Sequence, residues 1–330
     1  MNIIIDAMGG DNAPEEIVKG CIMAAADFDE TITLVGKEDI ISALLKKHNY
    51  AGEKIKIVNA TEIISGDDEP TMAIRQKKDS SLRVGLNMLH RGEGDVLVSA
   101  GNTGALISGA TLIVKRIKGV RRVALAPMMP ADNGCFLLVD GGANAECTPA
   151  FLKQFAIMGS IYMEKIMKIS SPKIGLVNIG SEEEKGTPVV NETHKLLKEI
   201  PINYVGYIEG REIPQGEVDV VVCDGFTGNV ILKFMEGMGI VIKSYLKKLF
   251  FKNIVSKLAA LLVKSGIKEL GKTMDYTEYG GAPILGSSKP VIKAHGSSNA
   301  KAFYHAIRQA IDMVNNNLVE TIADNISKYE

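Results

Sequence analysis

The stretch Asp95-Val-Leu-Val-Ser-Ala-Gly-Asn-Thr-Gly-Ala105 joins a short apolar run to a glycine-bearing turn, and a helical pattern follows it over residues 103–115. A short run that is apolar on both faces is typical of a parallel strand covered by helices on both sides. The same order of strand, turn and helix recurs along the chain. We therefore expect an α/β fold, a three-layer αβα sandwich with a largely parallel sheet.

Six further strands of this kind are predicted at residues 2–5, 31–35, 54–58, 173–178, 202–208 and 218–223. Helices are predicted at residues 14–27, 71–91, 149–168, 188–198 and 298–318. One mid-chain feature differs, because residues 123–129 and 135–140 flank a segment ending in Asn133-Gly134. An Asn-Gly pair favours a tight turn, so these two runs predict an antiparallel hairpin.

Composition and length exclude several classes of protein. The 330 residues are 46% hydrophobic, and 38 Lys and Arg against 39 Asp and Glu give a net charge of −1, which argues against a nucleic-acid partner. Four dispersed cysteines and an N-terminus without a basic secretory region predict a cytoplasmic protein without disulfides or zinc. With no linker in the sequence, we expect residues 1–330 to form a single compact body whose two intimate lobes share sheet and core.

Five turns rich in Gly, Asn and Asp follow predicted strands, at residues 6–14, 99–104, 140–144, 178–186 and 224–229. Ligands of open α/β sheets bind at the carboxyl ends of strands, where backbone N–H groups and helix N-termini can hold an anion. For any single turn, ordinary chain reversal is the alternative. The sequence contains no GxGxxG, GxSxG or HExxH motif, so we expect an anion site without a metal or an organic cofactor.

Four stretches carry a resemblance to a known family, and it runs essentially end to end. The stretches are Asp6-Ala-Met-Gly-Gly-Asp-Asn-Ala-Pro14, Ser99-Ala-Gly-Asn-Thr-Gly-Ala105, Asp224-Gly-Phe-Thr-Gly-Asn-Val230 and His295-Gly-Ser-Ser-Asn299. Together they resemble the phosphate acyltransferases of bacterial phospholipid synthesis. The resemblance implies a fold similar to phosphotransacetylases and isocitrate dehydrogenases. It also implies cofactor-free transfer of a long-chain acyl group from acyl carrier protein to inorganic phosphate.

Two other functions stay open at this point. A decarboxylating dehydrogenase of related fold would need a nicotinamide and a divalent metal. A membrane-surface scaffold without catalysis would need only a lipid-binding segment.

Acyl transfer to phosphate needs a cradle for a dianion and donors for the oxyanion. Lys185 is the lone cation of an acidic turn, and His295 is a further acid–base candidate, ranked below it. The predicted catalytic residues are Lys185, Asn229, Asp224 and His295. The predicted phosphate- and substrate-binding residues are Gly101, Asn102, Thr103, Gly104, Asp140, Asn144, Gly225, Thr227 and Gly228.

Each of these residues also has a structural alternative: a solvated charge for Lys185, a cap or turn residue for each Asn and Asp, and a structural role for His295. We expect Asp140 and Asp224 to hold hydrogen-bond donors, because two carboxylates beside a dianion would repel it. The residues expected to shape the pocket without reacting are Asp6, Gly9, Gly10 and Asp11.

A lysine-rich segment follows the last strand motif. Residues 243–272 contain eight Lys and one acid, Glu269, interleaved with bulky apolar side chains. At about 100° per residue one apolar arc forms, typical of an interfacial helix on an anionic membrane. We therefore predict that residues 240–272 protrude as an amphipathic helical segment, with a core or homodimer interface as the alternative. The predicted membrane contacts are Phe250, Phe251, Ile254, Leu258 and Leu262.

These features predict the partners of the chain. A peripheral membrane position would place the product beside a membrane acyl-phosphate:glycerol-3-phosphate acyltransferase, and a homodimer is expected. A basic cluster, Lys115, Arg116, Arg121 and Arg122, is predicted to dock the acidic carrier protein, with a solvated helix end as the alternative.

Overall fold

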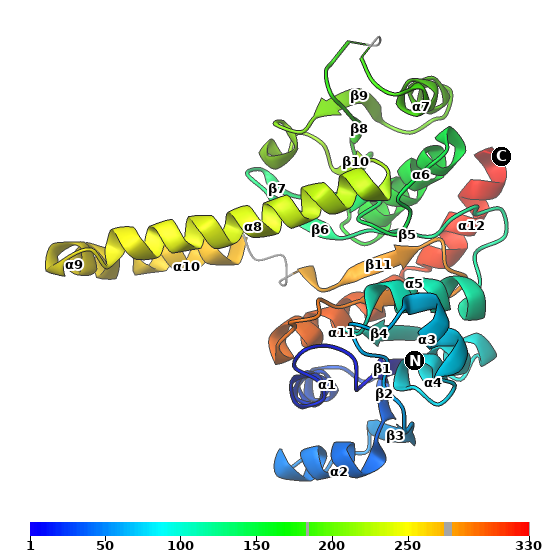
Figure 1. The fold of residues 1–330 in the computed structure, drawn as a ribbon, viewed down its shortest axis with the longest axis vertical. Helices are drawn as coiled ribbons and strands as arrows, with labels where there is room; N and C mark the ends of the chain where they lie inside the picture. Colours follow the sequence, from blue (N-terminus) through cyan, green and yellow to red (C-terminus); the bar gives the residue numbers. More distant parts are fainter. Residues whose placement is uncertain (183–184, 274–278, 330) are drawn as a thin grey trace.

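The computed structural model describes residues 1–182, 185–273 and 279–329. The chain forms two lobes, each built on its own sheet (Figure 1). The first sheet has the order β3-β2-β1-β4-β12-β11-β5, in which the first five strands are parallel and β11 is antiparallel to both neighbours. Its strands, in chain order, are β1 (Asn2–Asp6), β2 (Thr31–Gly36), β3 (Ile55–Asn59), β4 (Val96–Ser99), β5 (Ala124–Leu125), β11 (Ala282–Leu285) and β12 (Val291–Lys293).

The second sheet has the order β6-β7-β10-β8-β9, and all its pairs except β6–β7 are parallel. Its strands are β6 (Met128–Ala131), β7 (Gly134–Val139), β8 (Ile174–Asn178), β9 (Tyr204–Glu209) and β10 (Val220–Val222). The predicted hairpin is confirmed, because β6 and β7 pair with Ala131 opposite Gly134. The α/β class, with largely parallel pairing and a mid-chain hairpin, is thus confirmed.

Helices cover both sheets. They are α1 (Glu15–Asp27), α2 (Glu38–Lys47), α3 (Pro70–Gln76), α4 (Ser81–Arg91), α5 (Thr103–Gly109), the π-helix η1 (Ala110–Val114), α6 (Pro149–Lys165), α7 (Pro188–Lys198), the 3₁₀ helix η2 (Ile213–Gln215), α11 (Ala300–Asn315) and α12 (Leu318–Tyr329). The prediction of a single helix at residues 71–91 is wrong, because two helices, α3 and α4, occupy this stretch. Ser80 adopts extended backbone and its hydroxyl accepts from the N–H of Arg83, so it caps a new helix there.

The two lobes share a core but not a sheet. One buried apolar cluster contains Ile5 and Val98 of the first lobe together with Leu137, Val220 and Phe155 of the second. The expectation of a shared sheet is therefore wrong, and the reason lies between β5 and β6. The N–H of Ala126 donates to Pro283 in the first sheet, whereas the carbonyl of Pro127 accepts from Leu138 in the second. Since proline has no N–H, the ladder of the first sheet stops there.

The remaining helices form an arm. Three helices project from the body (Figure 1): α8 (Gly225–Phe250), α9 (Ile254–Leu262) and α10 (Lys264–Thr273). The apolar arc predicted across residues 250–262 is interrupted, because Asn253 accepts from the N–H of Ser256 and starts a new helix. Among the helices of the described residues, α8 is long and apolar enough to cross a membrane by length and composition.

Candidate functional site

One rim of the first sheet gathers polar side chains at the carboxyl ends of three neighbouring strands. Asp6 of β1 and Lys293 of β12 both lie opposite Ser99 of β4 in the strand register. The Asp6 carboxylate is buried and accepts from the hydroxyls of Ser81 and Ser99, both at 2.6 Å, and from the N–H of Met8 at 3.3 Å. Burial nevertheless raises the pKa of Asp6.

The turns after these strands pack directly on one another. A Cβ added to Gly9 would lie 2.4 Å from Asp6 Oδ2 and 2.8 Å from the backbone of Gly101, so the first two turns meet at glycines. The N–H of Asp11 donates to the carbonyl of Gly296 at 2.8 Å, which joins the turn after β12. Gly10, at a φ of 111°, completes this turn. The role of these residues in shaping a pocket stays a prediction.

The turn after β4 leads into α5. The N–H of Gly101 donates to the Ser99 hydroxyl, and Asn102 Oδ1 accepts from the N–H of Ala105. The Asn102 amide also donates to three carbonyls of the segment 65–68, so this side chain is engaged as a helix cap. The N–H groups of Thr103 and Gly104 belong to the first turn of α5, where no intrahelical acceptor exists. They stay the phosphate donors predicted for this turn.

Lys293 was missed by the sequence predictions. Its side chain is buried, and its ammonium donates to the carbonyls of Ala100 at 3.0 Å and Ala294 at 2.5 Å. Burial lowers the pKa of Lys293 to about 8. The omission follows from β12, a three-residue strand that was not predicted. The available signal was a lysine ending the apolar pair Val291-Ile292 just before the His295 motif.

His295 lies at the same rim and meets the arm. Its Nδ1 is 2.8 Å from the Ser297 hydroxyl, and its Nε2 is 3.8 Å from Oε1 of Glu236 in α8. Glu236 also pairs with Lys233 at 2.8 Å. Burial lowers the pKa of His295. Helix α8 therefore starts in the second lobe and brings a charged pair to the rim of the first.

The second lobe has its own buried carboxylate, Asp140, directly after β7. It accepts from four backbone N–H groups, those of Leu125, Gly142, Ala143 and Asn144, and from the Asn144 amide. Burial raises the pKa of Asp140. The Asn144 amide donates further to the carbonyl of Val123. These side chains hold the turn together, the structural alternative that the sequence left open.

The first turn of α8 packs on this Asp140 turn. Asp224 caps the helix, accepting from the N–H and hydroxyl of Thr227. The N–H of Gly225 donates to the carbonyl of Asn144, and that of Gly228 to the carbonyl of Asp224. A phosphate cradle was predicted at 225–229, but the N–H groups of Gly225, Thr227 and Gly228 are occupied by protein acceptors. The predicted oxyanion donor Asn229 is exposed and lies beside Gly142.

Lys185 lies apart from the other predicted residues. It follows β8, its side chain is 54% exposed, and its ammonium pairs with Glu182 at 2.7 Å. The turn after β8 extends from the outer end of the second lobe (Figure 1). Lys185 thus follows a strand of the second sheet, whereas β1, β4 and β12 belong to the first, and the solvated-charge alternative describes its surroundings.

The predicted docking and membrane residues are on the surface. Lys115, Arg116, Arg121 and Arg122 are all exposed. The Arg122 guanidinium lies 5.6 Å from the ring centroid of Phe151, which anchors the cluster on α6. In the arm, Phe250 is half-buried, whereas four apolar side chains are exposed: Phe251, Ile254, Leu258 and Leu262.

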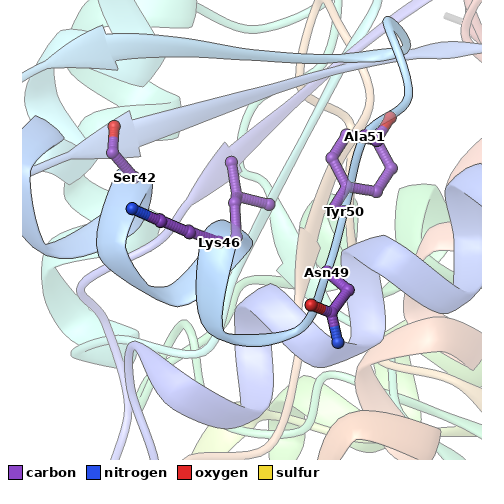
Figure 2. Close-up of a pocket in the computed structure, with 6 residues that line it drawn as sticks. Ser42, Lys46, Asn49, Tyr50 and Ala51 are labelled. Atoms are coloured by element: carbon purple, nitrogen blue, oxygen red, sulfur yellow. The ribbon is translucent and has the colours of Figure 1, made fainter.

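A surface hollow lies elsewhere, beside α2. It has a volume of about 580 Å³ and is lined by Ser42, Leu45, Lys46, Asn49, Tyr50 and Ala51 (Figure 2). Helix α2 packs against β2 and β3, so the hollow is at the β3 end of the first sheet rather than at the rim with Asp6. In the described ranges, no group of three or more His, Cys, Asp or Glu side chains is arranged to hold a metal ion.

Comparison with known proteins shows the family to which this chain belongs. A family model described as "Fatty acid synthesis protein" matches residues 1–321. A protein named phosphate acyltransferase from Alkaliphilus oremlandii is 50% identical over 327 residues, covering 99% of this chain and 98% of that protein. A second of that name, from Thermoanaerobacter pseudethanolicus, is 51% identical over 327 residues, covering 99% and 97%.

A solved structure confirms the fold. The phosphotransacetylase of Streptococcus pyogenes superposes with a TM-score of 0.67 at 17% identity, covering 96% of this chain and 94% of that one. The resemblance carried by the four motif stretches is confirmed by the relatives at half identity. The chain therefore belongs to the fatty acid synthesis protein family and is an acyltransferase.

Proposed function

We propose that the protein transfers a long-chain acyl group from acyl carrier protein to inorganic phosphate, at the rim formed by β1, β4 and β12. The observation that carries this proposal is the convergence of three turns there, after Asp6, Ser99 and Lys293, beside the first turn of α5. The N–H groups of a helix start, which have no intrahelical acceptor, and a nearby buried cation suit an anionic acceptor. The names of the half-identical relatives, phosphate acyltransferase, support phosphate as that acceptor.

The reaction needs no further reagent. A phosphate oxygen attacks the thioester carbonyl carbon, a C–O bond forms, and the C–S bond breaks. The phosphate proton ends on the departing thiolate, so the products are acyl phosphate and the free carrier thiol. N–H donors at the rim hold the dianion in the position of attack, and exclusion of water protects the acyl phosphate.

The test is direct formation of acyl phosphate. Purified protein, palmitoyl carrier protein and phosphate should give a product that hydroxylamine traps as the hydroxamate, and omitting phosphate should abolish it. Absence of phosphate-dependent product would contradict the function.

For the carrier protein, the exposed basic cluster supports docking. Helix α5 and η1 lead from the turn at Thr103 to this cluster, so it lies at the far end of a helix that starts at the rim. Arg121→Glu with Arg122→Glu should raise KM for the carrier substrate about tenfold and leave KM for a small acyl thioester unchanged. Equal effects on both substrates would place docking elsewhere.

For the membrane, the exposed apolar side chains of α9 support peripheral attachment of the cytoplasmic protein by the arm, beside a membrane acyl-phosphate:glycerol-3-phosphate acyltransferase. Leu258→Glu with Leu262→Glu should abolish co-sedimentation with anionic vesicles and preserve soluble activity. Leu112→Glu, at an exposed leucine of the body, is the matched control. A change from homodimer to monomer with unchanged co-sedimentation would instead assign the stripe to a subunit interface.

A further inference from the structure

We propose that the ammonium group of Lys293 binds the phosphate that accepts the acyl group. The inference rests on the proposed function, and it names a residue that touches the substrate. Its starting point is position, because Lys293 ends β12 opposite Ser99 and beside the turn 99–104. Its ammonium also donates to the carbonyl of Ala100, so a ligand held by this turn would lie near the lysine.

The hydrogen bonds of Lys293 leave capacity for a ligand. An ammonium group carries three donors. Two are taken by the carbonyls of Ala100 and Ala294, and within the described part of the chain no acceptor for the third is present. The residue retains 8% exposure, so it is buried without being completely enclosed. Lysines are almost never buried to this extent without a charged partner.

The same two hydrogen bonds fix the direction of two carbonyl groups at the rim. Carbonyls of two adjacent strand ends, at Ala100 and Ala294, point to one cation. Because these oxygens are engaged by the ammonium, they present less negative charge to an anion at the rim. Lys293 therefore both supplies positive charge and withdraws acceptors that would repel phosphate.

The charged and titratable groups that face Lys293 include His295 of the following turn, whose own pKa the Lys293 charge lowers, and groups of three further segments. Asp6 of β1 and Asp11 of the following turn favour the charged ammonium, whereas Lys233 of α8 disfavours it. The Asp6 carboxylate is engaged by two hydroxyls and a backbone N–H. Within the described residues the Lys293 ammonium contacts two carbonyls and no carboxylate. Its positive charge is thus only partly compensated, and a bound dianion would complete the balance.

Lys185 offers an instructive contrast. It was predicted to neutralise phosphate, but it is half-exposed and already paired with Glu182 at 2.7 Å. A desolvated cation attracts an anion more strongly than an exposed, paired one, because solvent screens the latter. The geometry therefore favours Lys293 as the phosphate ligand.

The experiment compares Lys293→Gln with Lys289→Gln, an exposed lysine just before the same strand. Acyl phosphate formation is measured with phosphate and palmitoyl carrier protein varied in turn. Lys293→Gln should raise KM for phosphate on the order of 10- to 100-fold and change KM for the carrier substrate less than about twofold. Lys289→Gln should change neither. An unchanged KM for phosphate in Lys293→Gln would overturn the inference.

Lys293→Arg separates binding from a merely structural role. Arginine stays charged at all pH values used, so it should restore phosphate binding in part. In the wild type, KM for phosphate should rise as pH increases through about 8, because Lys293 loses its proton there. Lys293→Arg should lack that rise, although phosphate itself ionises identically in both proteins. A rise of the same size in both would contradict a charge role for Lys293.

Thermal unfolding with inorganic phosphate alone is independent of turnover. Phosphate should raise Tm of the wild type and of Lys289→Gln, and leave Tm of folded Lys293→Gln unchanged. A wild type that makes no acyl phosphate but is stabilised by phosphate through Lys293 would overturn only the proposed function. A wild type that makes acyl phosphate while Lys293→Gln keeps full stabilisation by phosphate would overturn only this inference.

Discussion

Two buried aspartates end strands in the two lobes, and their surroundings differ. Asp140 accepts five hydrogen bonds, four from its own turn and one from the N–H of Leu125 in β5. Asp6 accepts from two side-chain hydroxyls, Ser81 and Ser99, and one N–H, with a buried cation nearby. The carboxylate of Asp140 is occupied by four backbone N–H groups and one side-chain amide, which hold its turn together. That of Asp6 lies among side chains and a lysine, where a ligand can contribute.

The comparison separates a structural role from a functional one. Sequence alone shows both residues as an aspartate before a glycine-bearing turn. A carboxylate that organises backbone N–H groups contributes mainly to the stability of the turn and of the helix packed on it. A carboxylate near a desolvated lysine instead adjusts the charge of that lysine. Changes in the second lobe should therefore act on folding, and changes at the first rim on phosphate binding.

The largest effect is expected from Asp140→Ala. Five donors lose their acceptor in a buried site, and each unsatisfied donor costs about 1–3 kcal/mol before relaxation. We expect the free energy of unfolding to fall by about 4 kcal/mol, measured by urea titration. Asp224→Ala, which removes only the cap of α8, should cost about 1 kcal/mol. Similar losses in the two variants would contradict the claim that the hydrogen bonds of Asp140 stabilise the protein more than the cap at Asp224 does.

Gly228→Ala should come next. Its Cβ would lie 1.9 Å from the carbonyl oxygen of Asp140, so the helix or the turn must shift. We expect a loss of about 3 kcal/mol in the free energy of unfolding. Gly237→Ala, on the same helix, meets no atom within 4 Å and should instead stabilise the protein by about 0.5–1 kcal/mol. Equal signs in the two variants would show that close packing is not why glycine occupies position 228.

The same contrast explains how far the sequence could be interpreted. The apolar runs of β1 and β4, the Asn133-Gly134 hairpin and the polar strand ends were all predicted, because each has a local signal. β12 was missed, since three residues are too few to show a period, and Lys293 was missed with it. The saturation of Asp140 depends on how its turn closes, and the ion pair of Lys185 on how its turn folds. Neither the hydrogen bonds of Asp140 nor the ion pair of Lys185 can be predicted from the residues next to it in the sequence.

At the first rim, Asp6→Asn should move the pH dependence of phosphate binding. The Asp6 charge raises the pKa of Lys293, so removing it lowers that pKa below about 8. The rise in KM for phosphate should then begin at a pH lower by roughly one unit. The amide oxygen of asparagine can accept from one of the two hydroxyls, Ser81 or Ser99, and its NH2 group can donate to the other, so the fold should persist, which circular dichroism checks. If KM starts to rise at the same pH as in the wild type, the charge of Asp6 does not affect the pKa of Lys293.

The smallest effect is expected from Lys233→Gln in α8, and its sign is opposite. Lys233 lies on the exposed side of the rim, paired with Glu236, and its positive charge lowers the pKa of Lys293. Removing it should raise that pKa and shift the pH dependence of KM for phosphate upward by roughly a few tenths of a unit, because solvent screens an exposed charge. Asp6→Asn and Lys233→Gln should thus move the pH at which KM for phosphate rises in opposite directions from the wild-type value. A shift of the same sign in both variants could not arise from charge acting on Lys293, and it would mean that a different group titrates at this rim.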